Sequence, residues 1–127
     1  MEIFGIGTDI IEVDRVKKAI EKHPRFLEKI YTRNEIFYCQ SKKENKYQSF
    51  ASRFAAKEAV AKSLHHGLGK YIFFSEIEIL NDENGSPYVA LHGNSHLYFL
   101  MNDLRDINIT MSSTNNYAIA YAVSLKK

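Results

Sequence analysis

Two hydrophobic periodicities divide the chain. In the first half, apolar residues recur every three or four positions between polar breaks, as in helices, whereas much of the second half alternates polar and apolar residues, as in half-buried strands. Helices are predicted from about residue 14 to the His23-Pro24 pair, over 32–40, over about 47–64 and over 94–102. Strands are predicted over 2–8, 75–80 and 88–91, followed by a hairpin of 107–112 and 117–123 that turns at Asn115-Asn116.

Short signals mark where these elements begin, end or touch others. Thr32, followed three residues later by Glu35, is a capping-box pattern that opens the second helix. Polar residues 42–47 predict a loop, and the turn formers over 81–87 join two strands. Gly5 and Gly7 lie inside the first strand, where glycine often marks the close approach of another backbone or a ligand.

The order of these elements indicates the fold class. One strand is followed by helices and then by strands around a further helix, which is typical of an α+β protein with a mostly antiparallel sheet. The 127 residues contain no linker, repeat or low-complexity tract, so residues 1–127 are predicted to form a single domain with a substantial core.

Composition narrows the class of protein. No apolar run approaches the roughly 20 residues that a membrane helix needs, and the N-terminus lacks the basic start of a secretory signal, so we expect no membrane association. The single cysteine, Cys39, excludes internal disulfides and favours a reducing, cytoplasmic location. Because Cys39 lies among aromatic residues with no obvious activating neighbour, we interpret it as a structural thiol and not a nucleophile.

The net charge of +2 is unevenly distributed. Residues 12–62 hold thirteen Lys or Arg against seven Asp or Glu, whereas the rest of the chain holds four against eight. A basic surface attracts an acidic protein, a polyanion or a phosphate-rich small molecule, although a solvated helical face would show much the same surplus.

The helix predicted over 47–64 carries an acid among basic residues. Glu58 and Lys62 are four residues apart and project from one helical face, which also holds Ala51, Phe54 and Ala55. Taken alone, this pattern is better explained as an exposed ion pair between Glu58 and Lys62, which contributes only about 0.3–0.5 kcal/mol.

Asp9, at the end of the first predicted strand, supplies a second carboxylate. Alone, Asp9 or Asp14 is better explained as the cap of the following helix. Together, Asp9 and Glu58 indicate a site for Mg²⁺, which prefers one or two carboxylates with waters and substrate phosphates. No Walker-type glycine loop is present, so Lys62 and Arg53 are the candidate phosphate ligands, and Lys57 is expected to pair with an acid on a neighbouring turn.

The histidines do not resemble a zinc site. His65 and His66 are adjacent, so they point in different directions on a helix, and no cysteine or acidic partner stands at ligand spacing. We interpret them as surface or phosphate-contacting residues at a helix end.

Two segments closely resemble the paired signatures of the bacterial holo-[acyl-carrier-protein] synthase family, the small type of 4′-phosphopantetheinyl transferase. These segments are Gly5-Ile6-Gly7-Thr8-Asp9-Ile10-Ile11-Glu12-Val13-Asp14-Arg15 and Arg53-Phe54-Ala55-Ala56-Lys57-Glu58-Ala59. The resemblance covers nearly the whole chain in order, including Thr32-Arg33-Asn34-Glu35, Asn84-Gly85-Ser86-Pro87 and Tyr117-Ala118-Ile119-Ala120.

The resemblance implies a fold and a reaction. A mostly antiparallel sheet would pack on a long central helix. The enzyme would transfer 4′-phosphopantetheine from coenzyme A to a serine of apo-acyl carrier protein, release adenosine 3′,5′-bisphosphate and support fatty acid biosynthesis. The family is a homotrimer with active sites between subunits.

The resemblance also implies residue roles. Asp9 and Glu58 match the Mg²⁺ ligands and, with Lys62, form the catalytic set. The serine proton would pass to a metal-bound water or to Glu58, and the sequence leaves both open. Residues assigned to coenzyme A are Arg53, Lys62, His66 and Gly67. Residues assigned to the acidic carrier protein are Arg15, Lys18, Lys22, Arg25 and Phe26, the last as an apolar anchor.

The chain departs from the family pattern in two places. His65-His66-Gly67-Leu68-Gly69 stands where the family usually has Gly-Thr-Gly-x-Gly, so imidazoles replace small residues near the coenzyme A phosphates. Ser113 stands where the family often has a histidine, so a contact to the nucleotide end is lost or supplied otherwise.

Two other classes of function fit part of the pattern. A non-enzymatic basic module that binds RNA or another acidic partner would use the surplus of Lys and Arg but give Asp9 and Glu58 no role. A metal-dependent phosphodiester hydrolase would use the same carboxylates with water as the nucleophile. The resemblance favours the transferase, with no nucleic-acid partner.

Overall fold

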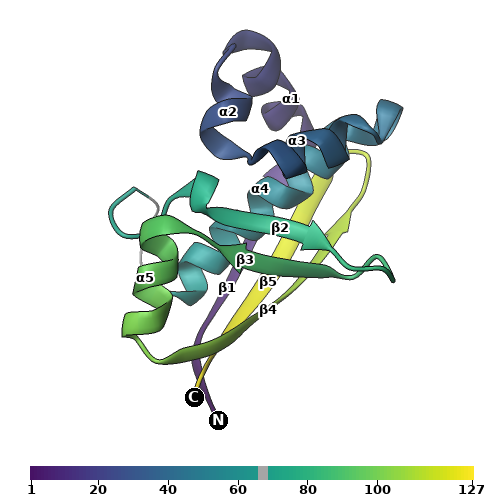
Figure 1. Ribbon diagram of the computed structural model, residues 1–127. Coiled ribbons are helices and arrows are strands. Elements are labelled where there is room, and N and C mark those ends of the chain that lie inside the picture. Colours follow the sequence, from purple (N-terminus) through teal and green to yellow (C-terminus); the bar gives the residue numbers. More distant parts are fainter. Residues whose placement is uncertain (66–68) are drawn as a thin grey trace.

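The computed structural model describes residues 1–65 and 69–127 (Figure 1). The first half contains β1 (Glu2–Glu12), α1 (Val13–Lys22), α2 (Phe26–Ile30), α3 (Arg33–Gln40), the 3₁₀ helix η1 (Lys43–Asn45) and α4 (Lys46–Ser63). The second half contains the 3₁₀ helix η2 (Phe74–Glu76), β2 (Ile77–Asn81), β3 (Pro87–Leu91), α5 (Gly93–Met101), β4 (Leu104–Ser113) and β5 (Tyr117–Lys126).

The strands form two antiparallel sheets. A three-stranded sheet has the order β1-β5-β4, so the first and last strands of the chain pair along their length and the two termini lie side by side (Figure 1). A separate hairpin joins β2 to β3. The α+β class and the antiparallel pairing predicted from the sequence are confirmed.

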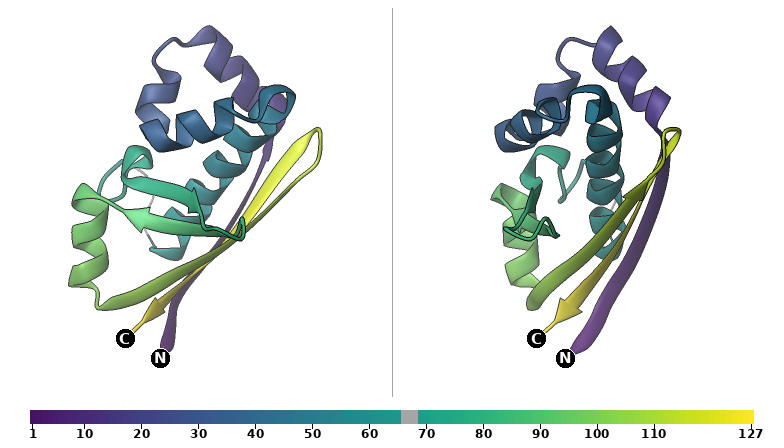
Figure 2. Two further views of the ribbon diagram at one scale, coloured as in Figure 1. Left: turned by 45° about the vertical axis from the view of Figure 1, so that its right-hand side comes forward. Right: turned by 90° about the vertical axis from the view of Figure 1, so that its right-hand side faces the viewer.

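Helix α4 is the central element of the fold. It lies between the three-stranded sheet on one side and α3 with the β2–β3 hairpin on the other (Figure 2). Alanines at 55, 56 and 59 are fully buried, and their small side chains let the sheet approach the helix closely. Phe50, Val60 and Leu64 fill the remaining core around them.

Gly5 and Gly7 allow β1 to approach α4. A Cβ atom added at Gly5 would lie 2.0 Å from the Ser63 carbonyl oxygen, and one added at Gly7 would lie 2.0 Å from the Ala59 carbonyl oxygen. The sequence prediction that another backbone approaches these glycines is therefore confirmed. The consequence is that residues 8–10 of β1 run directly beside the last turns of α4.

Strand β1 is longer than the sequence suggested. Its pairing with β5 continues to Glu12, so Asp9 lies inside the strand, opposite Ala120, and the prediction that it ends the strand is wrong. Neither Asp9 nor Asp14 caps α1. The cap residue is Glu12, and the first helical N–H, that of Val13, donates to the Asn116 carbonyl at 2.8 Å instead.

Other local predictions hold with small shifts. Thr32 and Glu35 form the expected capping box of α3. The predicted loop over 42–47 contains η1 and the first residues of α4. Cys39 is fully buried, and burial raises the pKa of its thiol, as expected for a structural cysteine.

The outer face of the three-stranded sheet is bare. Figure 2 shows α4 against one face and no described element against the other. Large apolar side chains are exposed on this face, from the edge strand β1 and the central strand β5, namely Ile6, Ile10, Tyr117 and Tyr121. A sheet face in contact with water normally carries mostly polar side chains, so the fold of one chain does not explain this exposed apolar face.

Candidate active site

Asp9 and Glu58 meet where β1 crosses the C-terminal half of α4. Asp9 occupies a position of β1 that faces the helix, between the inward-facing Gly7 and Ile11. Glu58 is on the facing side of α4, close enough that the Asp9 charge raises its pKa. Because β1 is the edge strand of its sheet, this junction stays open to solvent on one side.

Lys62 closes the cluster one turn further along α4. Its Nζ lies 3.6 Å from Asp9 Oδ1 and donates a hydrogen bond to the Thr8 carbonyl at 2.9 Å. The Lys62 side chain remains 54% exposed, whereas that of Asp9 is 19% exposed. The ammonium group therefore sits at the mouth of the site, with an exposed side free for an anionic ligand.

Both carboxyls are harder to ionise than usual. Burial is the main cause that raises the pKa of Asp9, and the nearby Lys62 offsets it only in part. Burial likewise raises the pKa of Glu58, the neighbouring charge of Asp9 raises it further, and Lys62 lowers it. The two carboxylates therefore repel each other in a partly desolvated place, with one exposed ammonium as compensation.

This donor set fits a hard divalent cation. Within residues 1–65 and 69–127, no three His, Cys, Asp or Glu side chains gather into a metal cage. Two carboxylates at an open junction leave most of an octahedral coordination shell for water and phosphate oxygens, which is the preference of Mg²⁺. A cation between Asp9 and Glu58 would also remove the repulsion that raises their pKa values.

Arg53 lies apart from this cluster, on another face of α4. Its side chain is almost fully buried, its Nη2 donates to Asn81 Oδ1, and its Cζ lies 4.1 Å from the centroid of the Tyr38 ring. Its Nε is buried without a hydrogen-bond partner among the described residues. A buried donor without a partner indicates a place for a water molecule or a ligand.

A groove opens over Arg53. It is a hollow of about 310 Å³ without a carboxylate in its lining, whose polar residues include Lys42, Ser49, Ser52, Arg53, Ser112 and Ser113. Ser113, one of the two departures noted in the sequence, thus lies in the same groove as Arg53. The sequence analysis missed three residues of this groove, Lys42, Tyr38 and Asn81. They come from separate parts of the chain, so no spacing pattern relates them to Arg53.

Lys57 belongs to the core and not to the site. Its Nζ lies 2.7 Å from Glu35 Oε1, both side chains are fully buried, and it also donates to the carbonyls of Phe74 and Ile77. The second Glu35 oxygen accepts from the Ile79 N–H at 2.8 Å. The prediction that Lys57 pairs with an acid on a neighbouring turn is therefore wrong, because its partner Glu35 comes from α3, across the core.

The histidine predictions have a mixed outcome. His65 is exposed but held to β1, since its Nε2 lies 2.6 Å from the Phe4 carbonyl and its ring packs edge-on against Phe4. This contact favours a role in the helix–strand junction over contact with phosphate. His66 and Gly67, assigned to coenzyme A, lie outside the described residues.

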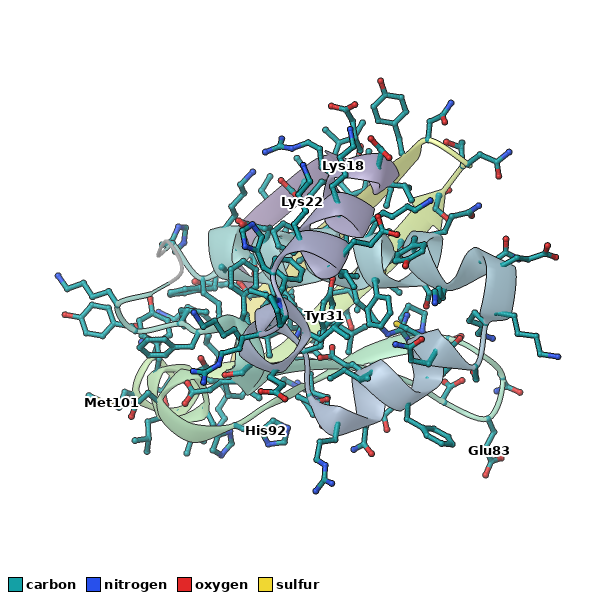
Figure 3. All side chains as sticks on the ribbon, turned by 90° about the horizontal axis from the view of Figure 1, so that it is seen from above. Lys18, Lys22, Tyr31, Glu83, His92 and Met101 are labelled. Atoms are coloured by element: carbon teal, nitrogen blue, oxygen red, sulfur yellow. The ribbon has the colours of Figure 1, made fainter. Side chains whose placement is uncertain are left out.

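The predicted docking residues lie on α1 and in the turn and helix after it. Figure 3, seen from above, shows Lys18 and Lys22 on α1, which faces the viewer. Lys18 forms an exposed ion pair with Asp14 at 2.9 Å, and Arg15, Lys22 and Arg25 are exposed. Phe26 is half-buried, and its ring packs against Tyr31 and Phe54, so it has less free surface than an exposed anchor would.

Sequence comparisons relate the chain to proteins of known activity. The family model of the 4′-phosphopantetheinyl transferase superfamily matches residues 5–122. The holo-[acyl-carrier-protein] synthase of Ruminiclostridium cellulolyticum is 54% identical over 119 residues, which cover 93% of this chain and 89% of the relative. That of Halothermothrix orenii is 42% identical over 122 residues, which cover 95% and 96%.

Solved structures share the fold. The synthase of Neisseria meningitidis superposes with a TM-score of 0.88 at 27% identity, over 98% of this chain and 99% of that one. The synthase of Bacillus anthracis, in complex with CoA (3′,5′-ADP), gives 0.83 at 32% identity over the whole of both chains. That of Helicobacter pylori, in complex with coenzyme A, gives 0.82 at 30% identity over 94% and 98%.

Proposed function

The chain belongs to the holo-[acyl-carrier-protein] synthase family of the 4′-phosphopantetheinyl transferase superfamily, and on this premise we propose its reaction in detail. The family predicted from the two sequence motifs is confirmed. The proposed reaction transfers 4′-phosphopantetheine from coenzyme A to a serine of apo-acyl carrier protein, releases adenosine 3′,5′-bisphosphate and supports fatty acid biosynthesis.

The observation that carries this proposal is the cluster of Asp9, Glu58 and Lys62. The two carboxyls have raised pKa values because they are partly buried and close together, beside one exposed ammonium. Groups with pKa values shifted in this way gather at functional sites more often than elsewhere. A cluster of this charge pattern suits a cation bound together with a diphosphate.

Asp9 and Glu58 are the residues that would hold Mg²⁺. The bound ion would supply charge neutralisation and a template for the diphosphate oxygens. Lys62, whose ammonium is at the mouth of the site, stabilises negative charge on the departing bisphosphate. The serine oxygen forms the new bond to phosphorus, the bond from phosphorus to the bridging oxygen breaks, and the serine proton passes to Glu58 or to a water molecule.

Arg53 is proposed to bind a phosphate of coenzyme A. Its guanidinium lies in a groove that holds Lys42 and several hydroxyl groups, and its buried Nε has no protein partner among the described residues. A planar guanidinium is well suited to phosphate oxygens. The hydroxyl of Ser113, in the same groove, is available where the family's histidine is absent.

The carrier protein is proposed to dock on α1 and the turn that follows. Arg15, Lys22 and Arg25 are exposed there, and Lys18 adds a further positive charge that Asp14 partly neutralises. Opposite charge accelerates the encounter of two proteins and sets their orientation. Phe26 is expected to contribute a smaller contact than the four basic residues.

The bare sheet face supports assembly into a homotrimer with active sites between subunits. A largely apolar groove on this face is lined by Ile6, Tyr121 and Val123 among others and includes Lys62 in its lining. A second copy seated on the apolar face would therefore lie beside the Asp9–Glu58 junction.

No helix among the described residues is long and apolar enough to cross a membrane, and we place the reaction in the cytoplasm because the lone cysteine forms no disulfide.

An intact-mass measurement tests the proposal. Apo-acyl carrier protein is incubated with the enzyme, coenzyme A and Mg²⁺, and in parallel with a chelator. The expected result is a carrier protein heavier by one phosphopantetheine arm, only when the cation is present. Consumption of coenzyme A without a change in carrier mass would indicate a hydrolase, and no change in either would contradict an enzymatic role.

A further inference from the structure

Arg53 is held in place by neighbours from three elements. The ring of Tyr38, on α3, lies against the guanidinium at 4.1 Å from Cζ. Asn81, the last residue of β2, accepts a hydrogen bond from Nη2 through its Oδ1. Ser49, one turn earlier on α4, accepts a longer hydrogen bond from Nη1 at 3.5 Å. The side chain is 3% exposed, so these contacts define its orientation.

The amide of Asn81 is itself oriented. Its Nδ2 donates a hydrogen bond to the Gly85 carbonyl at 3.0 Å, across the turn between β2 and β3. A flipped amide would place NH₂ against the guanidinium and an oxygen against that carbonyl, so both contacts select the same orientation. The turn therefore fixes the nearer of the two acceptors that face Arg53.

We infer that Asn81 is a positioning residue that holds the Arg53 guanidinium in its groove, ready for a phosphate of coenzyme A. This inference rests on the proposed role of Arg53. A guanidinium already ordered by stacking and by two hydrogen bonds loses little side-chain freedom when a ligand binds, which favours affinity. The buried Nε without a partner is one of the guanidinium donors that the described residues leave unused.

The alternative is that Asn81 only closes its own turn. The turn has further hydrogen bonds of its own, from the Asp82 N–H to Ser86 and from the Gly85 N–H to Asp82. It should therefore survive the loss of the Asn81 side chain. A purely structural role and a positioning role then differ in whether the effect of removing Asn81 depends on Arg53.

A double-mutant cycle tests the inference. Asn81→Ala, Arg53→Lys and the double variant are compared with wild type for KM of coenzyme A, KM of carrier protein and kcat. Asn102→Ala is the matched control, because its amide also donates to a backbone carbonyl, that of Tyr98, but does not touch Arg53. Thermal unfolding of each variant monitors the fold.

The expected result is that Asn81→Ala raises KM for coenzyme A about tenfold, since it removes a hydrogen bond to a charged group, with kcat and the carrier KM within about twofold. In the Arg53→Lys background the same change should add less than about twofold, because the side chain that Asn81 positions is gone. Asn102→Ala should leave all three constants unchanged.

Equal effects of Asn81→Ala in both backgrounds, or no effect in wild type, would overturn the inference. An unchanged KM for coenzyme A in Arg53→Lys alone would overturn both the inference and the proposed role of Arg53, while wild-type labelling of the carrier would still support the reaction. Tyr38→Leu provides a second test if Asn81→Ala does not fold. It should also raise KM for coenzyme A, and Tyr38→Phe, which keeps the ring, should raise it less than Tyr38→Leu does.

Discussion

Asp9 and Glu58 are in an arrangement that disfavours the folded state near neutral pH. Each has a raised pKa because it is partly buried, and in Glu58 the charge of Asp9 adds to the effect. A carboxyl whose pKa is higher in the folded than in the unfolded chain binds more protons when folded. Its ionisation therefore destabilises the protein above the folded pKa, and this cost disappears as the pH falls below the unfolded value, about pH 4.

The first prediction is that Glu58→Gln stabilises the cation-free protein and inactivates it. Removing one repelling charge should raise Tm at pH 7 by about 1–3 °C, because a half-buried pair is partly screened by solvent. The difference in Tm from wild type should vanish near about pH 4, where the side chain at position 58 is neutral in both proteins. Carrier labelling should fall at least about 100-fold.

Calorimetry in the presence of a chelator and a labelling assay measure the two effects. Glu83→Gln, on the exposed β2–β3 turn, is the control and should change neither. A lower Tm for Glu58→Gln across the whole pH range would contradict the account of these two carboxyls, and near-normal turnover would remove Glu58 from the site.

Sequence reasoning found these two acids only by combining two weak signals. The ion pair between Glu58 and Lys62 that the i,i+4 spacing favoured is wrong, because Lys62 pairs with Asp9 and not with Glu58 among the described residues. Asn81 and Lys42 could not be found in this way, because their relation to Arg53 depends on how β2 and the end of α3 pack against α4. Such distant contacts leave no periodic trace in the sequence.

At the level of elements, the contact between β1 and α4 positions the site. Gly7 lies two residues before Asp9, and a Cβ there would meet the Ala59 carbonyl at 2.0 Å. This carbonyl is part of the helix backbone and cannot rotate away as a flexible side chain could. The absence of a side chain at Gly7 therefore sets how closely Asp9 approaches Glu58.

The second prediction is that Gly7→Ala separates the strand from the helix. Overpacking of this kind costs about 1–3 kcal/mol, and contact with backbone places it at the upper end. Urea unfolding should show the lower free energy of unfolding. The folded variant should also need a higher concentration of divalent cation for half-maximal labelling of the carrier protein. Glu2→Ala, at an exposed position of the same strand, should change neither, and a stability of Gly7→Ala equal to wild type would contradict the packing argument.

Helix α4 divides its faces between core, groove and site. Lys57 is buried against Glu35, Arg53 faces the groove, and Glu58 with Lys62 faces β1. The sequence indicated that the helix carries charged chemistry, and its bounds were predicted within about one residue. It could not indicate which lysine is structural, because the Glu35–Lys57 pair joins two elements whose packing is decided by the tertiary fold.

At the level of the whole molecule, the basic first half is proposed to bind the carrier protein. The third prediction is that Arg15→Glu raises KM for carrier protein at least about tenfold and leaves KM for coenzyme A within about twofold, because Arg15 is exposed on α1 and does not line the groove over Arg53. Steady-state kinetics measures both constants. Raising salt to about 0.5 M should also slow the carrier reaction by screening these charges.

Lys126→Glu serves as the control for charge reversal, because it lies at the far end of β5. Equal changes in both KM values for Arg15→Glu, or a rate insensitive to salt, would argue against docking on α1.

The bare sheet face is proposed to be the surface through which subunits assemble. The fourth prediction is that wild type is a trimer in solution and that Ile6→Asp, which places a charge on this apolar face, shifts it to monomer. Size-exclusion chromatography with light scattering measures the mass. Leu100→Asp, at an exposed apolar position on α5, should remain a trimer. A monomeric wild type, or an unchanged mass for Ile6→Asp, would contradict assembly through the sheet.

The central claim is that Asp9 and Glu58 bind one divalent cation together with the diphosphate of coenzyme A. The fifth and most direct test is an anomalous difference map from crystals grown with Mn²⁺ and coenzyme A. We expect one peak at about 2.0–2.3 Å from a carboxylate oxygen of each residue and from phosphate oxygens of the ligand. A peak that contacts neither carboxylate, or carboxylate oxygens too far apart to share an ion while coenzyme A is bound, would contradict the account.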